Sequence, residues 1–452
     1  MARHPRIDRA VRQLRASAPQ VDRAVRRVRD TVAPVDRALQ RLGGGATPVD
    51  DSPFTAYAAV AELARRGPAP LVPRADRDAA RNTPDADRDA ARADRDAARG
   101  GATSDAAAAL DVAVVIPWFP PGSGGHATIF NLVRQLEARG HRCSIWLDDP
   151  TGRHAALADD EALAQRIEEQ FGGCSGPVHR GFSQWSGADV ALATSWTTAY
   201  RVQLLPGCRA RAYLVQDHEP EFHPTSAESE WAAATYRAGL HCIAASRWLA
   251  ELLRERYGAV ATHFDLGIDH DRYSPRPQTP RRDGRVLFYA RPSTDRRAVP
   301  LGLFALAELR RRRPQVELAL FGAPKPVATP FPCEQLGLLT PAQLADAYRG
   351  ATAGMVLSLT NPSLVPQEML ACGLPCVDVE RPSTRSEWGS SGGVELAAFD
   401  PQAIAGALER LLDDRALHAQ RSAAGLEWAR ERTWPRAAEQ VEAGLRAALG
   451  AG

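Results

Sequence analysis

The stretch Ser358-Leu-Thr-Asn-Pro-Ser-Leu-Val-Pro-Gln-Glu368-Met-Leu-Ala-Cys-Gly373-Leu-Pro375 decides the fold. It combines an apolar strand, a loop, a helix with one carboxylate, and a Gly-Leu-Pro turn into a second apolar strand. In an open parallel sheet, ligands bind at such a strand-to-helix turn. The backbone N–H groups of Ser363, Leu364 and Val365 are predicted to face an anion, because they begin a helix. Glu368, one turn later, can accept hydrogen bonds from both hydroxyls of a ribose. The stretch therefore predicts a nucleotide-diphosphate site.

Short apolar runs alternate with helical periodicity from residue 111 onward. The first series has apolar runs at 112–116, 143–147, 190–194, 212–215 and 242–245, and a polar, Pro-rich link follows at 274–284. The second series has apolar runs at 286–289, 316–321, 354–357 and 376–379, with helices expected near 298–312, 341–350, from 365, 401–413, 415–430 and 435–448. Because neither series shows hairpin turns, we predict an α/β protein of two Rossmann-like doubly wound domains facing a cleft.

The first 106 residues differ from the rest of the chain. An apolar triplet recurs three times between Ile7 and Leu42 among Arg-rich flanks, and a proline stands near the start of each repeat. This pattern predicts either a basic amphipathic element that meets an anionic membrane or a partner, or a solvated arm. Residues 75–99 repeat Ala-Asp-Arg-Asp-Ala-Ala-Arg and offer little apolar surface, which indicates a charged helical or disordered spacer. We place domain boundaries at 1–106, 107–278, 279–430 and 431–452.

The formal net charge of +2 is unevenly distributed. Residues 1–42 carry 11 Arg against 4 Asp, and the chain beyond residue 106 carries a formal −3. Because phosphate neutralisation needs a positive surface, the body is not expected to bind nucleic acid. Seven scattered cysteines without a CxxC pair predict free thiols in a reducing compartment, and no apolar window is long enough to cross a membrane. We expect a cytoplasmic protein, with peripheral contact at the inner face of the cell membrane if residues 1–42 bind lipid.

Two loops of the first series carry candidate site residues. After the first strand, Gly124 and Gly125 permit close approach of a ligand to the backbone, and His126 follows them. After the fourth strand, residues 216–223 hold five ionisable groups, among them Asp217 and Glu219. Such a cluster at the carboxyl end of a strand is typical of acceptor-hydroxyl recognition or general-base chemistry, although an ordinary turn and a solvated loop stay open as alternatives.

The second series supplies the cationic groups. The loop after its first strand contains Arg291 and Arg296, whose guanidinium groups suit a leaving pyrophosphate, although surface loops of this kind are often only basic. A metal site is disfavoured, because the acidic and histidine-rich loop lacks HExxH spacing. The pair Asp148-Asp149 is the alternative metal site, but guanidinium groups already offer the leaving group cationic partners. We expect no metal and no cofactor.

With these residues in place, the chain resembles the family 4 glycosyltransferases of the GT-B fold over about residues 110–448. It is most similar to the bacterial rhamnosyltransferases that build surface polysaccharides. The family signature has a Glu, seven residues, a second Glu and then A-x-G-x-P. Here the second Glu is Glu368, the tail is Ala371-Cys-Gly373-Leu-Pro375, and Thr360 stands at the first Glu position. The phrase from Gln216 to Phe222 is the most specific local match to that branch.

The resemblance implies transfer of a sugar from a nucleotide-diphosphate donor, dTDP-rhamnose in the leading case, to a glycan or lipid-linked acceptor, with retained anomeric configuration. It implies an acceptor domain at 107–278, a donor domain at 279–430 and a final helix at 431–452 that crosses back to the first domain. Among site residues, it implies a donor-binding set and a catalytic set near the transferred sugar or acceptor. The donor-binding set is Gly124, Gly125, Arg291, Arg296, Gly322, Ser363, Leu364, Val365 and Glu368; the catalytic set is His126, Asp217 and Glu219.

Two other functions stay open at this point. Thr360 at the first Glu position and the long repetitive N-terminal segment are compatible with a non-catalytic scaffold in a glycan-assembly complex. An epimerase of the same fold would act on the nucleotide sugar without an acceptor. Turnover of a sugar nucleotide with an acceptor would exclude the scaffold, and proton exchange at C2 of the sugar in deuterated buffer would indicate the epimerase.

Overall fold

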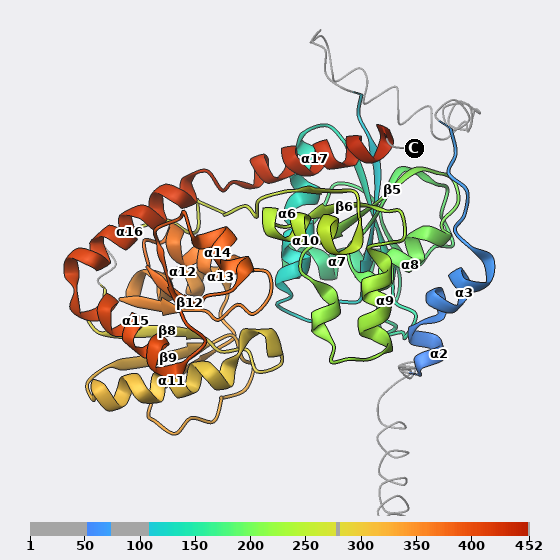
Figure 1. Ribbon diagram of the computed structural model, residues 1–452. Helices are drawn as coiled ribbons and strands as arrows, with labels where there is room; N and C mark the ends of the chain where they lie inside the picture. The colour runs from blue at the N-terminus through green and yellow to red at the C-terminus, as the bar shows by residue number, and fades with distance from the viewer. Residues whose placement is uncertain (1–51, 74–107, 277–280, 451–452) are drawn as a thin grey trace, which may run out of the picture. The chain divides into compact units, whose positions relative to one another are not determined.

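The computed structural model describes residues 52–73, 108–276 and 281–450 (Figure 1). Within them, Thr151–Ala156 is a stretch of turns by itself, and the other described residues form one compact unit. The predicted apolar triplets between Ile7 and Leu42 and the repeats at 75–99 lie outside the described residues.

The strands of the first half are β1 (Asp111–Pro117), β2 (Arg142–Asp148), β3 (Val178–Arg180), β4 (Ala188–Ala193), β5 (Cys208–Val215), β6 (His241–Ala244) and β7 (Ala261–His263). Those of the second half are β8 (Arg285–Tyr289), β9 (Glu317–Phe321), β10 (Glu334–Gly337), β11 (Ala353–Met355), β12 (Cys376–Val379) and β13 (Val394–Ala397). The helices are α2 (Pro53–Ala56), α3 (Ala58–Arg66), α6 (Gly124–Ala138), α7 (Asp160–Phe171), α8 (Trp196–Leu204), α9 (Ala227–Thr235), α10 (Arg247–Tyr257), α11 (Val299–Arg312), α12 (Pro341–Gly350), α13 (Leu364–Ala371), α14 (Pro382–Trp388), α15 (Pro401–Asp413), α16 (Arg415–Arg430) and α17 (Trp434–Gly450), with 3-10 turns η1 (Glu219–Phe222) and η2 (Asp295–Arg297).

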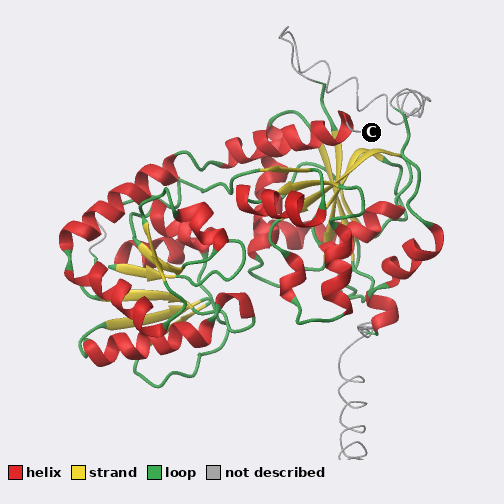
Figure 2. Ribbon diagram, viewed as in Figure 1, coloured by secondary structure: helices red, strands yellow, loops and turns green. Residues whose placement is uncertain are grey.

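The strands form two parallel sheets, each surrounded by helices (Figure 2). The first sheet has the order β3-β2-β1-β4-β5-β6-β7, and the second has the order β10-β9-β8-β11-β12-β13. Strands β4, β6 and β12 are buried at every residue, as expected where helices cover both faces of a parallel sheet. Such strands show apolar runs rather than alternation, which is why they were visible in the sequence. The prediction of two doubly wound domains is confirmed.

In each sheet the strand order reverses once. β1 pairs with both β2 and β4, and β8 pairs with both β9 and β11, so the connections leave β1 and β8 in opposite directions. Loops that diverge in this way open a crevice at the carboxyl ends of the strands, which is where doubly wound folds bind ligands. The loops after β1, β4, β8 and β11 are therefore the ones that the topology places to bind.

Helix α17 packs against the first sheet although it follows the second sheet in the chain. Trp434, Val441 and Leu445 are buried in the same apolar core as β1, β2 and β4, and α17 contacts α6, β5 and β6 (Figure 1). The helix begins against Gly267, where an added Cβ would lie only 2.6 Å from Trp434. Glycine is thus required at that position for the close approach of the two segments.

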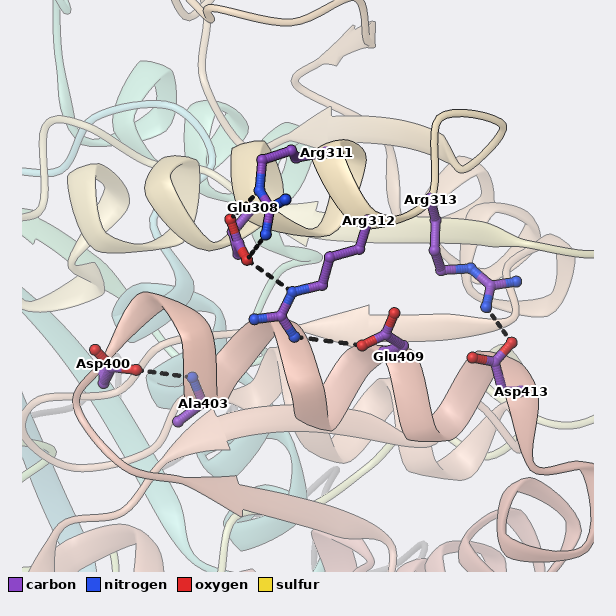
Figure 3. Close-up of polar contacts among 8 residues, drawn as sticks. All are labelled: Glu308, Arg311, Arg312, Arg313, Asp400, Ala403, Glu409 and Asp413. Atoms are coloured by element: carbon purple, nitrogen blue, oxygen red, sulfur yellow. Dashed lines mark hydrogen bonds and ion pairs between the residues drawn. The ribbon is translucent and has the colours of Figure 1, made fainter.

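Helices α11 and α15 lie side by side in the second half (Figure 3). Arg312 Nη1 of α11 is 3.3 Å from Glu409 Oε2 of α15, and Asp400 caps α15 by accepting from the Ala403 N–H at 2.8 Å. Ion pairs of this kind at the surface contribute little to stability. The contact is instead stabilised by the buried leucines that the two helices place in one core, namely Leu306, Leu309, Leu408 and Leu411.

Residues 52–73 pack on the first half, beside helices α8 and α9. The Tyr57 ring lies 5.7 Å from that of Trp196 on α8 and 5.0 Å from that of Trp231 on α9, measured between ring centroids. Its hydroxyl donates to Glu228 Oε1 at 3.2 Å, also on α9. The Val72 N–H donates to the Cys208 carbonyl at 2.9 Å. This part of the predicted extension is therefore joined to the fold by an aromatic contact that spans two helices.

We expect Tyr57→Ala to lower stability by roughly 2 kcal/mol, because it removes two aromatic contacts and one hydrogen bond. Thermal unfolding of the full chain measures this as a lower Tm. Phe54→Ala is the matched control, because Phe54 lies in the same segment but is 92% exposed. Tyr57→Phe keeps the ring contacts and should cost much less than Tyr57→Ala. Equal melting temperatures for Tyr57→Ala and Phe54→Ala would show that the contact is not stabilising.

Candidate functional site

A cavity of about 350 Å³ lies at the carboxyl ends of the strands of both sheets. Its walls come from the loops after β1, β4 and β5 in the first half and after β8 and β11 in the second. Ten of the twelve predicted site residues line it: Gly124, Gly125, His126, Asp217, Glu219, Arg291, Arg296, Ser363, Leu364 and Val365. Glu368 and Gly322 do not line this cavity. The volume falls in the range of small-molecule sites.

Three guanidinium groups border the cavity from the loop after β8. Arg296 is paired, because its Nε lies 2.9 Å from Asp217 Oδ2 and its guanidinium carbon lies 4.0 Å from the centre of the Phe222 ring. Arg297 is only 6% exposed, and its guanidinium makes one hydrogen bond, to Ser358 Oγ at 3.2 Å. Among the described residues, neither Arg297 nor Arg291 forms an ion pair with a carboxylate. Burial lowers the pKa of Arg297, which reports the cost of holding this charge away from water.

The N-terminus of α13 faces the same cavity. Ser363 stands at the N-cap position but its side chain does not cap the helix. Its Oγ is buried and has no hydrogen-bond partner among the described residues, and Ser363, Leu364 and Val365 all line the cavity. The start of a helix carries unpaired N–H groups and a partial positive charge. Within the described residues, the Ser363 hydroxyl and the start of α13 thus lie in the same cavity as two guanidinium groups that have no carboxylate partner. The predicted contact of 363–365 with an anion stays a prediction.

His126 forms part of the opposite wall, in the first turn of α6. Its Nε2 lies 3.3 Å from the Pro117 carbonyl oxygen, and its Nδ1 lies 2.8 Å from Ser123 Oγ. Because a carbonyl only accepts, Nε2 carries the proton and Nδ1 accepts from the serine hydroxyl. Gly124 precedes it, and a Cβ there would meet no protein atom within 4 Å, so the backbone at Gly124 borders open space.

Glu219 is a buried carboxylate of the first half, 5% exposed. Its Oε1 accepts from the Tyr213 hydroxyl at 2.6 Å, and its Oε2 accepts from the Trp196 N–H at 2.8 Å. Burial raises the pKa of Glu219 to about 7, and these two hydrogen bonds offset part of the effect. A carboxyl group that exchanges its proton near neutral pH is suited to acid–base work at a cavity wall.

Glu368 lies one turn into α13, as predicted, but faces two tyrosines. Its Oε2 accepts from the Tyr348 hydroxyl at 3.2 Å, and Tyr273 is a second hydrogen-bond partner. Burial raises the pKa of Glu368 to about 8, which the two tyrosines partly offset. The ring centroid of Tyr348 lies 5.9 Å from that of Phe321, and the ring centroid of Phe321 lies 5.2 Å from that of Tyr289. Tyr289 lines the cavity. These ring contacts connect Tyr348, the partner of Glu368, to the cavity wall.

Gly322 has a conformational role in the structure. Its φ is +96°, and an added Cβ would lie 2.5 Å from the Tyr289 ring. Only glycine fits both conditions, so Gly322 lets the Tyr289 ring pack at the end of β9. The predicted contact of Gly322 with a donor stays a prediction.

The sequence left the partners of three residues near the cavity open. Arg297 was visible beside Arg296, but nothing in the sequence showed which of the two would find a carboxylate. Thr360 was noted only as the residue at the first Glu position, and Asn361 was not singled out, because polar residues in a loop have no periodic signal. Thr360 Oγ1 donates to Asp217 Oδ2 at 3.0 Å, and Asn361 N donates to Asp217 Oδ1 at 2.9 Å, so both bind the other half.

Asp148, of the Asp148-Asp149 pair considered as a metal site, pairs with an arginine. Asp148 Oδ1 lies 3.1 Å from Arg201 Nε. In the part of the chain that the structure describes, His, Cys, Asp and Glu side chains form no group of three or more suited to a metal ion. All seven cysteines are free thiols. Over the same residues, no helix has both the length and the apolar character needed to span a bilayer.

Two parallel doubly wound sheets, with a cavity at the switch points of both, define the GT-B architecture. Solved structures share it. Sucrose-phosphate synthase from Thermosynechococcus elongatus aligns with a TM-score of 0.56 and 16% identity over 75% of this chain and 99% of that one. HepE from Anabaena, in complex with UDP and glucose, aligns with a TM-score of 0.56 and 15% identity over 75% and 100%. WaaG, a glycosyltransferase involved in lipopolysaccharide biosynthesis, aligns with a TM-score of 0.54 and 13% identity over 73% and 98%. The predicted GT-B fold is confirmed.

Two comparisons of sequence find relatives of this chain. The family model described as the C-terminal domain of WsaF matches residues 284–409, from the start of β8 into α15. The O-antigen biosynthesis protein RfbC of Myxococcus xanthus is 33% identical over 264 residues, which are 57% of this chain. The match covers 20% of the length of RfbC, so this chain is similar to about one fifth of that protein.

Proposed function

We propose that the protein is a glycosyltransferase that moves a sugar from a nucleotide-diphosphate donor to a glycan or lipid-linked acceptor in cell-surface polysaccharide synthesis. The likeness to an O-antigen biosynthesis protein and the GT-B fold shared with HepE, which holds UDP and glucose, support this class. We propose dTDP-rhamnose as the leading donor and retention of the anomeric configuration. We place the reaction in the cytoplasm, at the membrane if residues 1–42 bind lipid.

The proposal depends most on the buried guanidinium group of Arg297, which lines the same cavity as the N-terminus of α13. Within the described ranges, Arg297 is buried without an ion-paired carboxylate, and the Ser363 hydroxyl is buried without a hydrogen-bond partner, in one cavity. A buried guanidinium with so few hydrogen bonds lowers stability, and an anion bound beside it would offset that cost. Arg291, Arg297 and the start of α13 would hold the donor diphosphate.

The same groups would assist bond breaking. As the bond between the anomeric carbon and the diphosphate oxygen breaks, negative charge grows on the diphosphate. Fixed guanidinium groups and the N-terminus of α13 stabilise that charge more in the transition state than in the ground state. Because these cations belong to the protein, we propose that donor binding and transfer need no divalent metal. Transfer in the presence of a chelator tests that point.

The acceptor is proposed to enter along the first half. His126, Asp217 and Glu219 line this side of the cavity, so the transferred sugar would lie between them and the diphosphate cradle. The oxygen of an acceptor hydroxyl would then replace the diphosphate oxygen on the anomeric carbon. Glu219, with a pKa of about 7, is the carboxyl group on this wall that can exchange a proton at neutral pH.

Binding of a panel of nucleotides tests the proposal. Any ligand that binds only the native state raises the free energy of unfolding, by about 2.7 kcal/mol at a hundredfold excess over Kd, and therefore raises the Tm. We expect UDP, dTDP and their sugar conjugates to raise the Tm, and the corresponding monophosphates to raise it much less. A donor that raises the Tm should then label an acceptor extract with its sugar. If no diphosphate nucleotide raises the Tm more than its monophosphate, the proposed site is wrong; if donors bind but no sugar is transferred, the scaffold function is favoured.

A further inference from the structure

Asp217 is surrounded by hydrogen-bond donors that come mostly from the other half of the protein. Its Oδ1 accepts from the His218 N–H at 2.9 Å and the Asn361 N–H at 2.9 Å. Its Oδ2 accepts from Thr360 Oγ1 at 3.0 Å and lies 2.9 Å from Arg296 Nε. Asp217 thus accepts three hydrogen bonds and forms one ion pair, which leaves its carboxylate with few of its roughly four acceptor sites open.

The loop that binds Asp217 is anchored to the first half at further points. Asn361 Nδ2 donates to the carbonyls of Gln216 at 3.0 Å and Ala245 at 2.8 Å. Asn361 Oδ1 accepts from Ser246 Oγ at 2.7 Å. Asn361 is 2% exposed and every polar atom of its side chain has a partner. Buried networks that are fully satisfied in this way hold a unique geometry.

Position 360 has the chemistry that this network requires. A carboxylate there would face Asp217 at hydrogen-bonding distance, and two adjacent buried carboxylates repel each other. A hydroxyl at 360 instead donates to Asp217. The hydroxyl of Thr360 therefore suits a position 3.0 Å from a carboxylate of the first half.

Arg296 is held by first-half residues on two sides. Asp217 pairs with its Nε, and the Phe222 ring lies under its guanidinium. Arg296 is followed directly by Arg297, and Asn361 is followed two residues later by the N-cap of α13. Both arms of the proposed diphosphate cradle are thus attached to residues that Asp217 binds.

We infer that Asp217 is a positioning residue that acts from across the cavity. Its carboxylate fixes Arg296 and the loop from Thr360, and so sets Arg297 and the start of α13 relative to the acceptor wall. This inference rests on the proposed transferase function. Misplacement of reacting groups by about 1 Å can cost on the order of 100-fold in rate.

An exchange of the two side chains tests the inference. Asp217→Thr leaves Arg296 without its counter-ion, and Thr360→Asp places two carboxylates together; each should lower kcat at least 30-fold. The double variant Asp217→Thr/Thr360→Asp restores one carboxylate and one hydroxyl, and should recover kcat at least 10-fold over either single variant. KM for the donor should change less than threefold throughout, because Arg291 and Arg297 are untouched. A double variant no better than Asp217→Thr overturns the inference, as does a loss confined to KM.

Two controls separate this result from misfolding and from failure of the proposed function. Asp217→Asn keeps the size of the side chain but turns an amide group toward buried donors, so the Tm should fall and kcat should fall at least 10-fold at temperatures where a single cooperative transition shows the variant to be folded. Unchanged kcat in this variant overturns the inference. If the wild-type protein transfers sugar from no donor, the proposed function has failed. The melting temperatures of the four proteins then still test the contact across the cavity, because the double variant must melt above Thr360→Asp. Additive shifts in Tm would show that the two positions are not coupled.

Discussion

Replacing Arg297 with Gln should weaken binding of the nucleotide-diphosphate donor about 100-fold. A hydrogen bond to a charged group contributes about 1.5–3 kcal/mol, or roughly 10- to 150-fold in Kd, and a diphosphate presents more than one acceptor to a guanidinium. Calorimetry with UDP or dTDP measures the loss directly. The magnitude is large because Arg297 is 6% exposed, so water cannot take the place of the lost partner.

The Tm of the Arg297→Gln variant is a second measurement, and it should not fall although donor binding weakens. In the free protein Arg297 is a buried cation with one hydrogen bond, so removing its charge should leave the Tm unchanged or raise it. Arg285 is the matched control, because it is 8% exposed but lies 2.7 Å from Glu334 at the far end of β8. Arg285→Gln should lower the Tm and leave Kd unchanged. If Arg297→Gln lowers the Tm and leaves donor affinity intact, Arg297 is a structural residue and not part of an anion site.

Replacing Glu368 with Gln should remove discrimination between ribose and deoxyribose. A carboxylate that accepts from both hydroxyls of a ribose favours UDP over dUDP, and the missing hydroxyl should cost the wild-type protein about 10-fold or more in Kd. Glutamine keeps the size of the side chain but provides a weaker acceptor, so the two nucleotides should bind Glu368→Gln with similar Kd. The same titrations test the identity of the donor. Because dTDP carries deoxyribose, a strong preference for ribose would favour a ribonucleotide sugar over dTDP-rhamnose. Equal binding of UDP and dUDP to the wild-type protein would show that Glu368 does not grip the diol.

The raised pKa of Glu368 adds a dependence on pH. Hydroxyl donors bind the ionised carboxylate, so donor binding should lower its pKa and release a proton. UDP affinity should therefore rise with pH through about 8 in the wild-type protein and stay flat in Glu368→Gln. Calorimetry in buffers of different ionisation enthalpy measures the released proton. The sign for stability is opposite: the unfolded chain loses this proton near its ordinary pKa of 4.5, so this group's contribution falls as pH rises from about 4.5 to 8.

The long apolar strands were predictable because they are buried on both faces. β4 and β12 show uninterrupted apolar runs, and the predicted runs at 190–194 and 376–379 overlap them closely. β3, β7, β10 and β13 were missed, because each has three or four residues and lies at the edge of a sheet. Edge strands receive hydrogen bonds from one neighbour only, so their sequence is less constrained by burial.

The sequence also predicted which loops would meet at the site, but it did not predict which side chains would contact each other. Parallel strands bring the loops at their carboxyl ends together, so Arg291 and Ser363 were expected in one crevice and both line the same cavity. The packing of Tyr57 on α8 and α9 was invisible, because a single aromatic residue between two short helices has no periodicity that reveals its partner. The tyrosines around Glu368 lie 20 and 95 positions away in the chain, so no local pattern indicated them.

The sequence by itself determined the order of strands and helices, the two parallel sheets, and the loops that would meet at a ligand. These follow from burial and from the hydrogen-bonding geometry of the backbone, which act on neighbouring residues and leave periodic patterns. Only the tertiary structure decided that Arg296 pairs with Asp217, that Arg297 forms no ion pair with the carboxylates of the described residues, and that Thr360 donates to a carboxylate of the other half. The physical reason is that Coulomb energy and hydrogen bonding depend on distances of a few ångströms between groups far apart in the chain.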